Sequence, residues 1–273
     1  MAINPLGPRT LLDRTFYERR ASEKNPTSDN PEMTGLTRRI REWCGIRDGQ
    51  RVLDFGCYDG YIVRRMRSGA KIQGIGMDIS HRAAALAKYA GRRDGLDGLE
   101  FIVAEGANLP FPDKSFDVII CSEILEHVPD LDRVLSEIGR VLVKGGRLYA
   151  TMPNSLSDVW HPFHALCQRI DRVEGHLRRM TRGEFIAALQ RHRLQPVRVQ
   201  YRGFALSALW YSLFIYNPGV KRVGISLIGQ NESLFQRLAR TVAYGMMHIY
   251  IGFDNLFRDN RRCMGIDAAL SKL

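Results

Sequence analysis

Apolar positions recur with two different periods along residues 34–153. Between Thr34 and Cys44 they fall at Leu36, Ile40 and Trp43, a spacing that predicts an amphipathic helix. After this helix, short apolar runs alternate with segments of helical spacing. The predicted strands are Arg51–Phe55, Lys71–Ile79, Leu99–Ala104, Phe116–Cys121 and Gly146–Met152, and the helices between them are Tyr61–Ser68, Arg82–Ala90 and Asp130–Val143. This alternation is typical of βαβ units, so we expect an α/β fold whose parallel sheet is covered by helices on both faces.

The pattern changes beyond residue 153. Ser155–Asp171 has helical character, and Thr181 with Glu184 forms a T-x-x-E capping box ahead of a helix over Phe185–Arg191. Two further strands are predicted at Leu194–Tyr201 and Cys263–Ser271. A structureless loop of the roughly 60 residues between them would be unusual, so we expect this connection to be helical. The predicted organisation is a flexible N-terminal arm over 1–33, an α/β core over 34–203, a helical cap or insertion over 204–261, and a final core strand over 262–273.

Charge is distributed unevenly along the 273 residues. Residues 1–150 carry 23 Lys and Arg against 21 Asp and Glu, whereas residues 151–273 carry 17 against 8. A basic half suits nucleic acid, an anionic membrane surface or an anionic substrate. An ordinary solvated surface has the same composition, so charge alone does not decide among these classes.

Cysteine usage and apolar run length bear on the compartment. The five cysteines are odd in number and include no C-x-x-C pair, which argues against a disulfide framework or a zinc knuckle. Residues 1–30 contain no apolar core of a signal peptide, and no run reaches the roughly 18–20 apolar residues that cross a bilayer. We therefore expect a cytoplasmic protein, with membrane association left open.

A glycine-rich turn follows the first predicted strand, in VLDFGCYDG over residues 52–60. Gly56 and Gly60 let the backbone approach a ligand or adopt positive φ, and the next helix begins with unpaired N–H groups. Asp54 suits a ligand ammonium better than a phosphate, and the glycines do not fit the G-x-G-x-x-G pattern of dinucleotide sites. These features favour S-adenosylmethionine over NAD, although a simple tight turn would also need the glycines.

Two more carboxylates follow the next predicted strands. Asp78 ends the second strand, where an acidic residue accepts hydrogen bonds from ribose hydroxyls in nucleotide-binding sheets. Glu105 follows the third strand. Because the carboxyl ends of parallel strands meet at one edge, we expect Asp54, Asp78 and Glu105 to converge on a single ligand crevice.

With these motifs the chain resembles the class I S-adenosylmethionine-dependent methyltransferases, and in particular the branch of the ubiquinone and menaquinone biosynthesis methyltransferases. The matching segments are VLDFGCYDG (52–60), GMDIS (76–80), AEGANLPFPDKSFDVII (104–120), SEILEHVPD (122–130) and EIGRVLVKGGRL (137–148). The resemblance covers about residues 36–153 and implies a Rossmann-like sheet, whose last two strands would here be separated by the helical C-terminal cap.

The resemblance also implies which residues bind S-adenosylmethionine. The methionine moiety would lie against Asp54, Gly56, Cys57 and Gly60, the ribose hydroxyls against Asp78, and the adenine against Ile79, Glu105, Gly106 and Ala107, with Ser122 and Glu123 closing the pocket. The family usually has a glycine where this chain has Tyr58. Tyr58 adds bulk beside the cofactor's amino acid end, and we treat it as a candidate substrate-contacting residue.

Two histidine-containing segments are candidates for acceptor chemistry. His127, just after the fourth strand, is the candidate general base, and its structural alternative is to shape the loop. Glu123 could instead orient the cofactor amine. His161 and His164 form an H-x-x-H pair, but no third ligand is evident from spacing, so we expect no metal. We assign both histidines to a substrate lid.

The aromatic and basic segment over residues 204–261, with Trp210 as a predicted acceptor contact, favours a hydrophobic acceptor over a sugar. Its competing interpretations are peripheral membrane contact, additional core and a homodimer interface. Nucleic acid is less favoured, because the aromatics lie in apolar runs and no RNA-binding module appears. The predicted function is methyl transfer from S-adenosylmethionine to a small, lipid-like acceptor such as an isoprenoid or polyketide. The alternatives are an RNA methyltransferase and a cofactor-binding protein without transfer activity.

Overall fold

In the part of the chain that the structure describes, seven strands form one sheet in the order β3-β2-β1-β4-β5-β7-β6. The computed structural model describes residues 14–23, 27, 29–204, 206, 209 and 234–273. The strands are β1 (Arg51–Phe55), β2 (Gln73–Asp78), β3 (Leu99–Val103), β4 (Phe116–Cys121), β5 (Leu142–Pro153), β6 (Leu194–Arg202) and β7 (Gly265–Lys272). The helices are α1 (Arg14–Glu23), α2 (Pro31–Cys44), α3 (Tyr61–Gly69), α4 (His81–Arg93), α5 (Leu131–Val141), α6 (His164–Glu174), α7 (Arg182–Arg191) and α10 (Leu234–Asp254), with 3-10 turns η1 (His161–Phe163) and η3 (Asn255–Phe257).

Strand direction places the carboxyl ends of β1 to β5 at one edge. β1 pairs in parallel with both β2 and β4, and β4 pairs in parallel with β5. β7 lies antiparallel between β5 and β6. This arrangement confirms the predicted Rossmann-like methyltransferase sheet, including the insertion between its last two strands.

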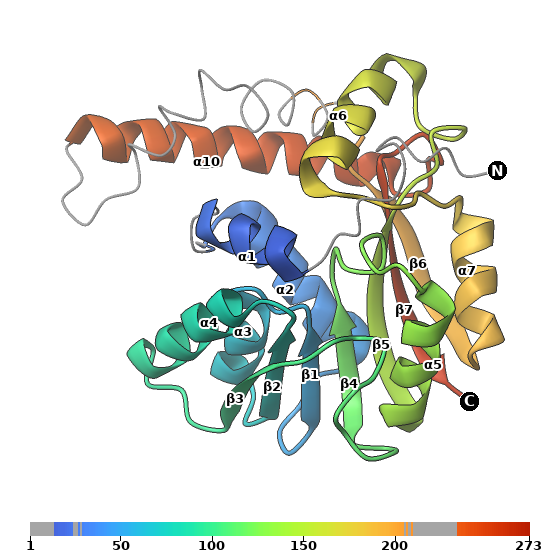
Figure 1. The fold of residues 1–273 in the computed structure, drawn as a ribbon. Coiled ribbons are helices and arrows are strands. Elements are labelled where there is room, and N and C mark those ends of the chain that lie inside the picture. Colours follow the sequence, from blue (N-terminus) through green and yellow to red (C-terminus); the bar gives the residue numbers. More distant parts are fainter. Residues whose placement is uncertain (1–13, 24–26, 28, 205, 207–208, 210–233) are drawn as a thin grey trace.

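Helices cover both faces of the sheet, as the alternating pattern predicts (Figure 1). One buried cluster joins α5 and α7 to strand residues such as Leu53 and Ile119. The other joins α2 and α3 to Val52 and Val118, the alternate positions of the same strands. Because successive strand residues point to opposite faces, continuous apolar strands such as β1 and β4 are required to fill both clusters.

Local signals fix the helix ends. Asn30 caps α2 by accepting a hydrogen bond from the Met33 amide at 2.9 Å, so this helix begins three residues before the predicted start. The predicted capping box of Thr181 and Glu184 is present at α7. The helix predicted over Ser155–Asp171 begins only at His164, because the preceding residues form turns around Ser155 and a 3-10 turn that contains Pro162.

Part of the segment predicted to be a flexible arm is helical. α1 packs against α4, and its Glu18 accepts hydrogen bonds from the Ser80 hydroxyl at 2.9 Å and from the His81 amide at 2.7 Å. The amides at the start of α4 lack partners within that helix, so a carboxylate there is favourable. Residues 14–23 thus contact the sheet domain through α4.

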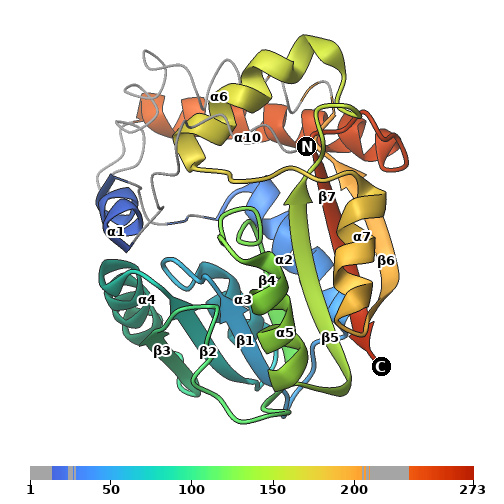
Figure 2. The same ribbon diagram turned by 45° about the vertical axis from the view of Figure 1, so that its right-hand side comes forward.

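Helix α10 lies in the insertion between β6 and β7. Figures 1 and 2 show it running across the molecule beyond one end of the sheet, beside α6. Among the described residues, no helix has the length and apolarity needed to cross a membrane. The predicted acceptor residue Trp210 lies outside the described residues.

Candidate active site

The turn after β1 is held by the neighbouring strand. The amides of Gly56 and Cys57 both donate to the Met77 carbonyl, at 2.7 and 2.9 Å. Gly56 has φ +76, and a Cβ there would lie 2.1 Å from Ile124 Cδ1. Gly60, with φ +71, precedes α3, and a Cβ there would lie 2.6 Å from Phe101. The glycines are required by the backbone conformation and by the close packing of the turn.

Asp54 lies at the base of this turn and is only 2% exposed. Its Oδ2 accepts a hydrogen bond from the Val63 amide at 3.2 Å. Burial raises the pKa of Asp54 to about 7, and the nearby carboxylates of Asp59 and Asp78 act in the same direction. A ligand cation would relieve this unfavourable environment, so the site favours an ammonium group.

Asp78 connects the turn to the start of α4. Its Oδ2 accepts from the Tyr58 amide and its Oδ1 from the Ser80 amide, both at 2.9 Å. Burial raises the pKa of this carboxyl as well. Tyr58 has φ +49, a left-handed conformation that is uncommon for a residue with a side chain. Asp78 thus fixes the Tyr58 backbone at the position where the family usually has glycine.

The other predicted cofactor residues lie along the same edge of the sheet. Ile79 follows β2 and is partly buried, and Glu105 follows β3 with an exposed side chain. A Cβ on Gly106 would lie 2.3 Å from the Phe55 ring, so glycine is needed for this close approach. Ser122 follows β4, and Cys57 is buried in the turn. The predicted set is therefore placed at the carboxyl ends of β1, β2, β3 and β4, while its contacts with a cofactor stay a prediction.

Helix α1 adds a residue that the sequence did not indicate. The Tyr17 ring stands edge-on to His127, with centroids 6.2 Å apart. Burial raises the pKa of Tyr17, and the carboxylates of Glu126 and Asp78 are near enough to raise it further. Tyr17 therefore lies between the predicted cofactor residues and the loop after β4. No motif in residues 1–33 pointed to this role.

A cavity of about 380 Å³ adjoins this loop. It is lined by Glu123 and His127 from the loop after β4, by Arg39 of α2, by Arg202 of β6, and by Tyr250 of α10. A larger cavity of about 690 Å³ lies at the opposite end of the sheet, beside Gln50, Asp117 and Arg147. Ligands of open α/β sheets bind at the carboxyl ends of the strands, so the smaller cavity is the candidate acceptor cavity.

Ion pairs fix the floor of the acceptor cavity. Glu123, at φ +57, pairs with Arg202 and accepts from the Thr151 hydroxyl at 2.9 Å. Arg202 Nε also donates to Asp267 Oδ1 at 2.6 Å, and Arg39 Nη1 donates to Asp267 Oδ2 at 2.9 Å. Asp267 is fully buried on β7. This network joins the loop after β4 to α2, β5, β6 and β7, and no local sequence pattern predicts it.

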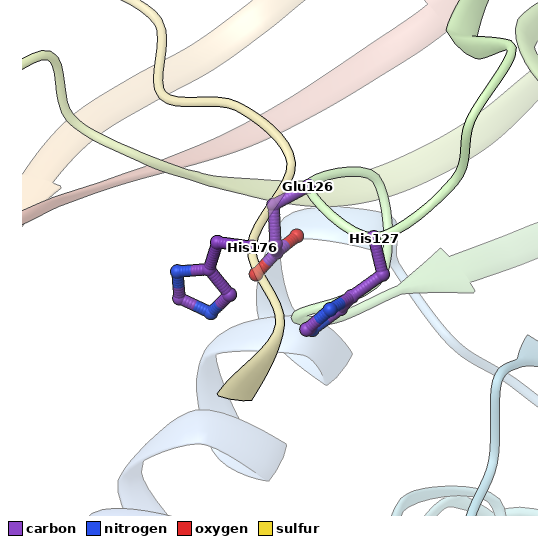
Figure 3. A group of neighbouring side chains, drawn as sticks. All are labelled: Glu126, His127 and His176. Atoms are coloured by element: carbon purple, nitrogen blue, oxygen red, sulfur yellow. The ribbon is translucent and has the colours of Figure 1, made fainter. Parts of the chain in front are cut away.

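The loop after β4 also contributes two of the three side chains of a compact group. One ligand-type atom each from Glu126, His127 and His176 lies within 4.8 Å of the others. Figure 3 shows the Glu126 carboxylate between the two imidazole rings. Burial raises the pKa of Glu126 well above its ordinary value, and the Glu123 carboxylate contributes in the same direction. His176 follows α6 and was not among the predicted site residues.

The remaining predicted acceptor residues do not join this group. His161 and His164 pack against each other with ring centroids 4.8 Å apart, and His164 Nε2 contacts the Val159 carbonyl at 3.0 Å. Neither histidine lines the 380 Å³ cavity.

Part of the chain is similar to known methyltransferases. Residues 53–150 match the family model described as a methyltransferase domain. The 27-O-demethylrifamycin SV methyltransferase of Amycolatopsis mediterranei (strain S699) is 38% identical over 116 residues, which are 42% of this chain and 43% of that protein. The phthiotriol/phenolphthiotriol dimycocerosates methyltransferase 1 of Mycobacterium ulcerans (strain Agy99) is 36% identical over 160 residues, 54% of this chain and 57% of its own. The matched region thus spans about half the length of these relatives.

A solved structure of geranyl diphosphate methyltransferase in complex with SAM shares the fold, with a TM-score of 0.64 at 17% identity, and covers 94% of this chain and 90% of that one. Residues 53–150 therefore match a methyltransferase domain, and the sheet order is that of the class I S-adenosylmethionine-dependent methyltransferase fold. The methyl donor of this family is S-adenosylmethionine. The narrower resemblance to the ubiquinone and menaquinone branch stays a prediction.

Proposed function

We propose that this protein binds S-adenosylmethionine at the turn after β1 and transfers its methyl group to a small molecule in the 380 Å³ cavity. The observation that carries this proposal is the pair of carboxylates at the ends of adjacent strands, with Asp54 opposite Gly76 in register and Asp78 two residues further along β2. The names of the relatives support a small-molecule acceptor, since they specify a rifamycin and lipids of the phthiotriol class.

Each half of the site has a distinct task. Asp54 would hold the ammonium of the cofactor's amino acid part and Asp78 its ribose hydroxyls. The sulfonium of the bound cofactor supplies the methyl group. Transfer to an acceptor depends mainly on alignment of the two reactants, so the rigid loop after β4 is the part that positions the acceptor. Tyr17 stands edge-on to His127 of this loop and would help to exclude water there.

Calorimetric titration with S-adenosylmethionine, with NAD as the comparison, tests the cofactor site. We expect binding of the first only, and a loss of affinity of about a hundredfold or more in Asp54→Ala and Asp78→Ala, about 3 kcal/mol for a charge-assisted contact. Asp117→Asn is the matched control, because Asp117 pairs with Arg51 at the opposite end of the sheet. Normal affinity in the two alanine variants would overturn the assignment.

We assign the acceptor-side role to His127, which lines the cavity and lies outside the turn. Substitution of His127 by Ala should reduce turnover while cofactor affinity is retained. An unchanged rate would limit His127 to a structural role.

We further propose that α10 contacts a lipid surface and delivers a lipid-like acceptor. One face of this helix lines the cavity through Tyr250 and Asp254. Apolar side chains on another face are exposed at helical spacing and continue into the following turn: Val242, Met246, Ile249, Phe253 and Leu256. Exposed Arg258, Arg261 and Arg262 come next in the sequence. An apolar stripe beside basic residues suits an anionic bilayer surface.

Sedimentation with phosphatidylcholine vesicles, with and without phosphatidylserine, tests this contact. We expect binding that requires phosphatidylserine and is weakened severalfold by Ile249→Glu. Tyr89→Glu is the matched control, because Tyr89 is an exposed apolar side chain on α4, away from α10. If Ile249→Glu instead changes only the oligomeric state, the stripe is a dimer interface and the membrane proposal fails.

A further inference from the structure

We infer that Glu126, His127 and His176 form a binding site for a divalent transition-metal ion at the wall of the acceptor cavity. No metal was expected from the sequence, because the H-x-x-H pair of His161 and His164 has no third ligand at a suitable spacing. The three residues come from two loops, with His176 49 positions after His127 and 50 after Glu126, so no ligand spacing was visible.

The strongest observation is the state of Glu126. Its side chain is completely buried, and among the residues that the structure describes neither carboxylate oxygen has a hydrogen-bond partner. Burying a carboxylate without a partner is costly, and such groups are normally paired or bound to a metal. Figure 3 shows this carboxylate directed between the two histidine rings. The unsatisfied oxygens therefore face the two groups best suited to share a metal with them.

Both histidines are oriented as metal ligands usually are. His176 Nδ1 contacts Asp171 Oδ1 at 2.8 Å, and Asp171 is in turn fixed by Arg179 Nε at 2.8 Å. His127 Nδ1 contacts the Gly175 carbonyl at 3.2 Å. A metal-binding histidine typically donates one ring N–H to a carboxylate or a backbone carbonyl, which directs the other nitrogen to the ion. Here each ring would coordinate through Nε2.

The backbone fixes the two loops against each other. Gly175 ends α6 in the left-handed conformation, and the His176 amide then donates to the Asp171 carbonyl at 3.0 Å. The Leu177 amide donates to the Glu126 carbonyl at 2.8 Å. Arg178 Nη1 donates to the carbonyls of Leu125 and Val128, at 2.7 and 2.5 Å. The ligands are thus supported by rigid surroundings before any ion binds.

Ligand chemistry selects the class of ion. Two imidazoles and one carboxylate suit Zn²⁺, Fe²⁺ or Co²⁺, whereas Mg²⁺ prefers oxygen ligands. Ligand atoms around a tetrahedral zinc ion lie roughly 3.4 Å apart. The three ligand-type atoms here lie within 4.8 Å of one another, so the side chains would close by up to about 1.4 Å. Three protein ligands leave a position open, and His127 and His176 both line the acceptor cavity.

The open position defines a task within the proposed function, on which this part of the inference rests. A divalent ion lowers the pKa of an oxygen that it binds. A hydroxyl acceptor would release its proton to solvent, its oxygen would form the new bond to the methyl carbon, and the bond from that carbon to sulfur would break with its electron pair left on sulfur. The site therefore favours an oxygen nucleophile as acceptor.

Metal binding can be tested without turnover. The protein is stripped with a chelator and titrated with Zn²⁺ by calorimetry, and Co²⁺ is added separately to record its visible absorption. We expect one ion per chain at micromolar or lower concentration, and a weakening of at least tenfold in both Glu126→Gln and His176→Ala. His161→Ala is the matched control, because His161 and His164 have a ring separation similar to that of His127 and His176. This variant should still bind one zinc ion per chain.

A parallel titration with S-adenosylmethionine separates this inference from the proposed function. Glu126→Gln keeps the size of the side chain, so retained cofactor affinity shows that the variant is folded. No zinc binding in the unsubstituted protein, or equal zinc affinity in Glu126→Gln and His176→Ala, overturns the metal site even when the cofactor binds. Zinc binding without cofactor binding overturns the methyltransferase proposal and leaves the metal site in place.

Discussion

The cofactor side and the acceptor side of this molecule are held together by different kinds of contact. The turn after β1 is fixed mainly by backbone hydrogen bonds to the next strand, such as those from Gly56 and Cys57 to Met77. The acceptor cavity is fixed by side-chain ion pairs between distant segments, such as Arg39 with Asp267, which are 228 positions apart. The first kind depends on residue types at short spacing, whereas the second exists only once the whole sheet has formed.

The difference is sharpest at Asp267, for which we expect the largest effect on stability. Asp267→Ala leaves two guanidinium groups without their shared, fully buried partner, which should lower the free energy of unfolding by about 3 kcal/mol. Urea denaturation measures this change. Asp117→Ala removes a carboxylate that is 30% exposed and bound to Arg51, and should cost under about 1 kcal/mol. An equal loss of unfolding free energy in the two variants would show that the buried ion pairs of Asp267 stabilise the fold no more than the exposed pair of Asp117.

The same contrast explains how much could be predicted from the sequence. Some features could be predicted because each depends on residue types at short spacing in the sequence. These are the order of strands and helices, the glycines at positions 56 and 60, and the capping box at Thr181. His176 was missed because its partner Glu126 is 50 positions away and joins it through a helix end at Gly175. Tyr17 was missed because α1 has weak apolar periodicity and gains its position from contact with α4.

The cofactor side should respond to pH through Asp54. Its pKa is about 7 in the folded protein, above the ordinary value near 4, so the folded state favours the protonated form. The stability from this proton is present below about pH 4 and is lost as pH rises through 7. Binding of an ammonium favours the ionised form. Affinity for S-adenosylhomocysteine should therefore fall about tenfold for each pH unit below 7.

Titrations between pH 5.5 and 7.5 measure this dependence. Methylthioadenosine is the matched ligand, because it lacks the amino acid part and should bind with little pH dependence over that range. Asp54→Asn should weaken S-adenosylhomocysteine and remove the slope. A slope that persists in Asp54→Asn would assign the titration to another group and separate Asp54 from the ammonium.

The smallest expected effect concerns α1, where the two sides of the site meet. Glu18 accepts three hydrogen bonds at the start of α4, from the Ser80 hydroxyl and the amides of His81 and Arg82. These bonds lower the pKa of Glu18, so the carboxylate is charged at neutral pH. Glu18→Gln keeps an acceptor but removes the charge that favours a helix N-terminus. We expect a loss of about 0.5 kcal/mol, because the group is solvent-accessible and screened by salt.

Hydrogen exchange of the α1 amides should therefore accelerate roughly twofold in Glu18→Gln, an effect that shrinks at high salt. Glu100→Gln, an exposed substitution on β3, should leave α1 exchange unchanged. Since Tyr17 stands beside His127, the same loosening should reach the loop after β4. Faster exchange confined to α4, with α1 unchanged, would mean that α1 is held by its apolar contacts and that Glu18 serves only to cap the helix it touches.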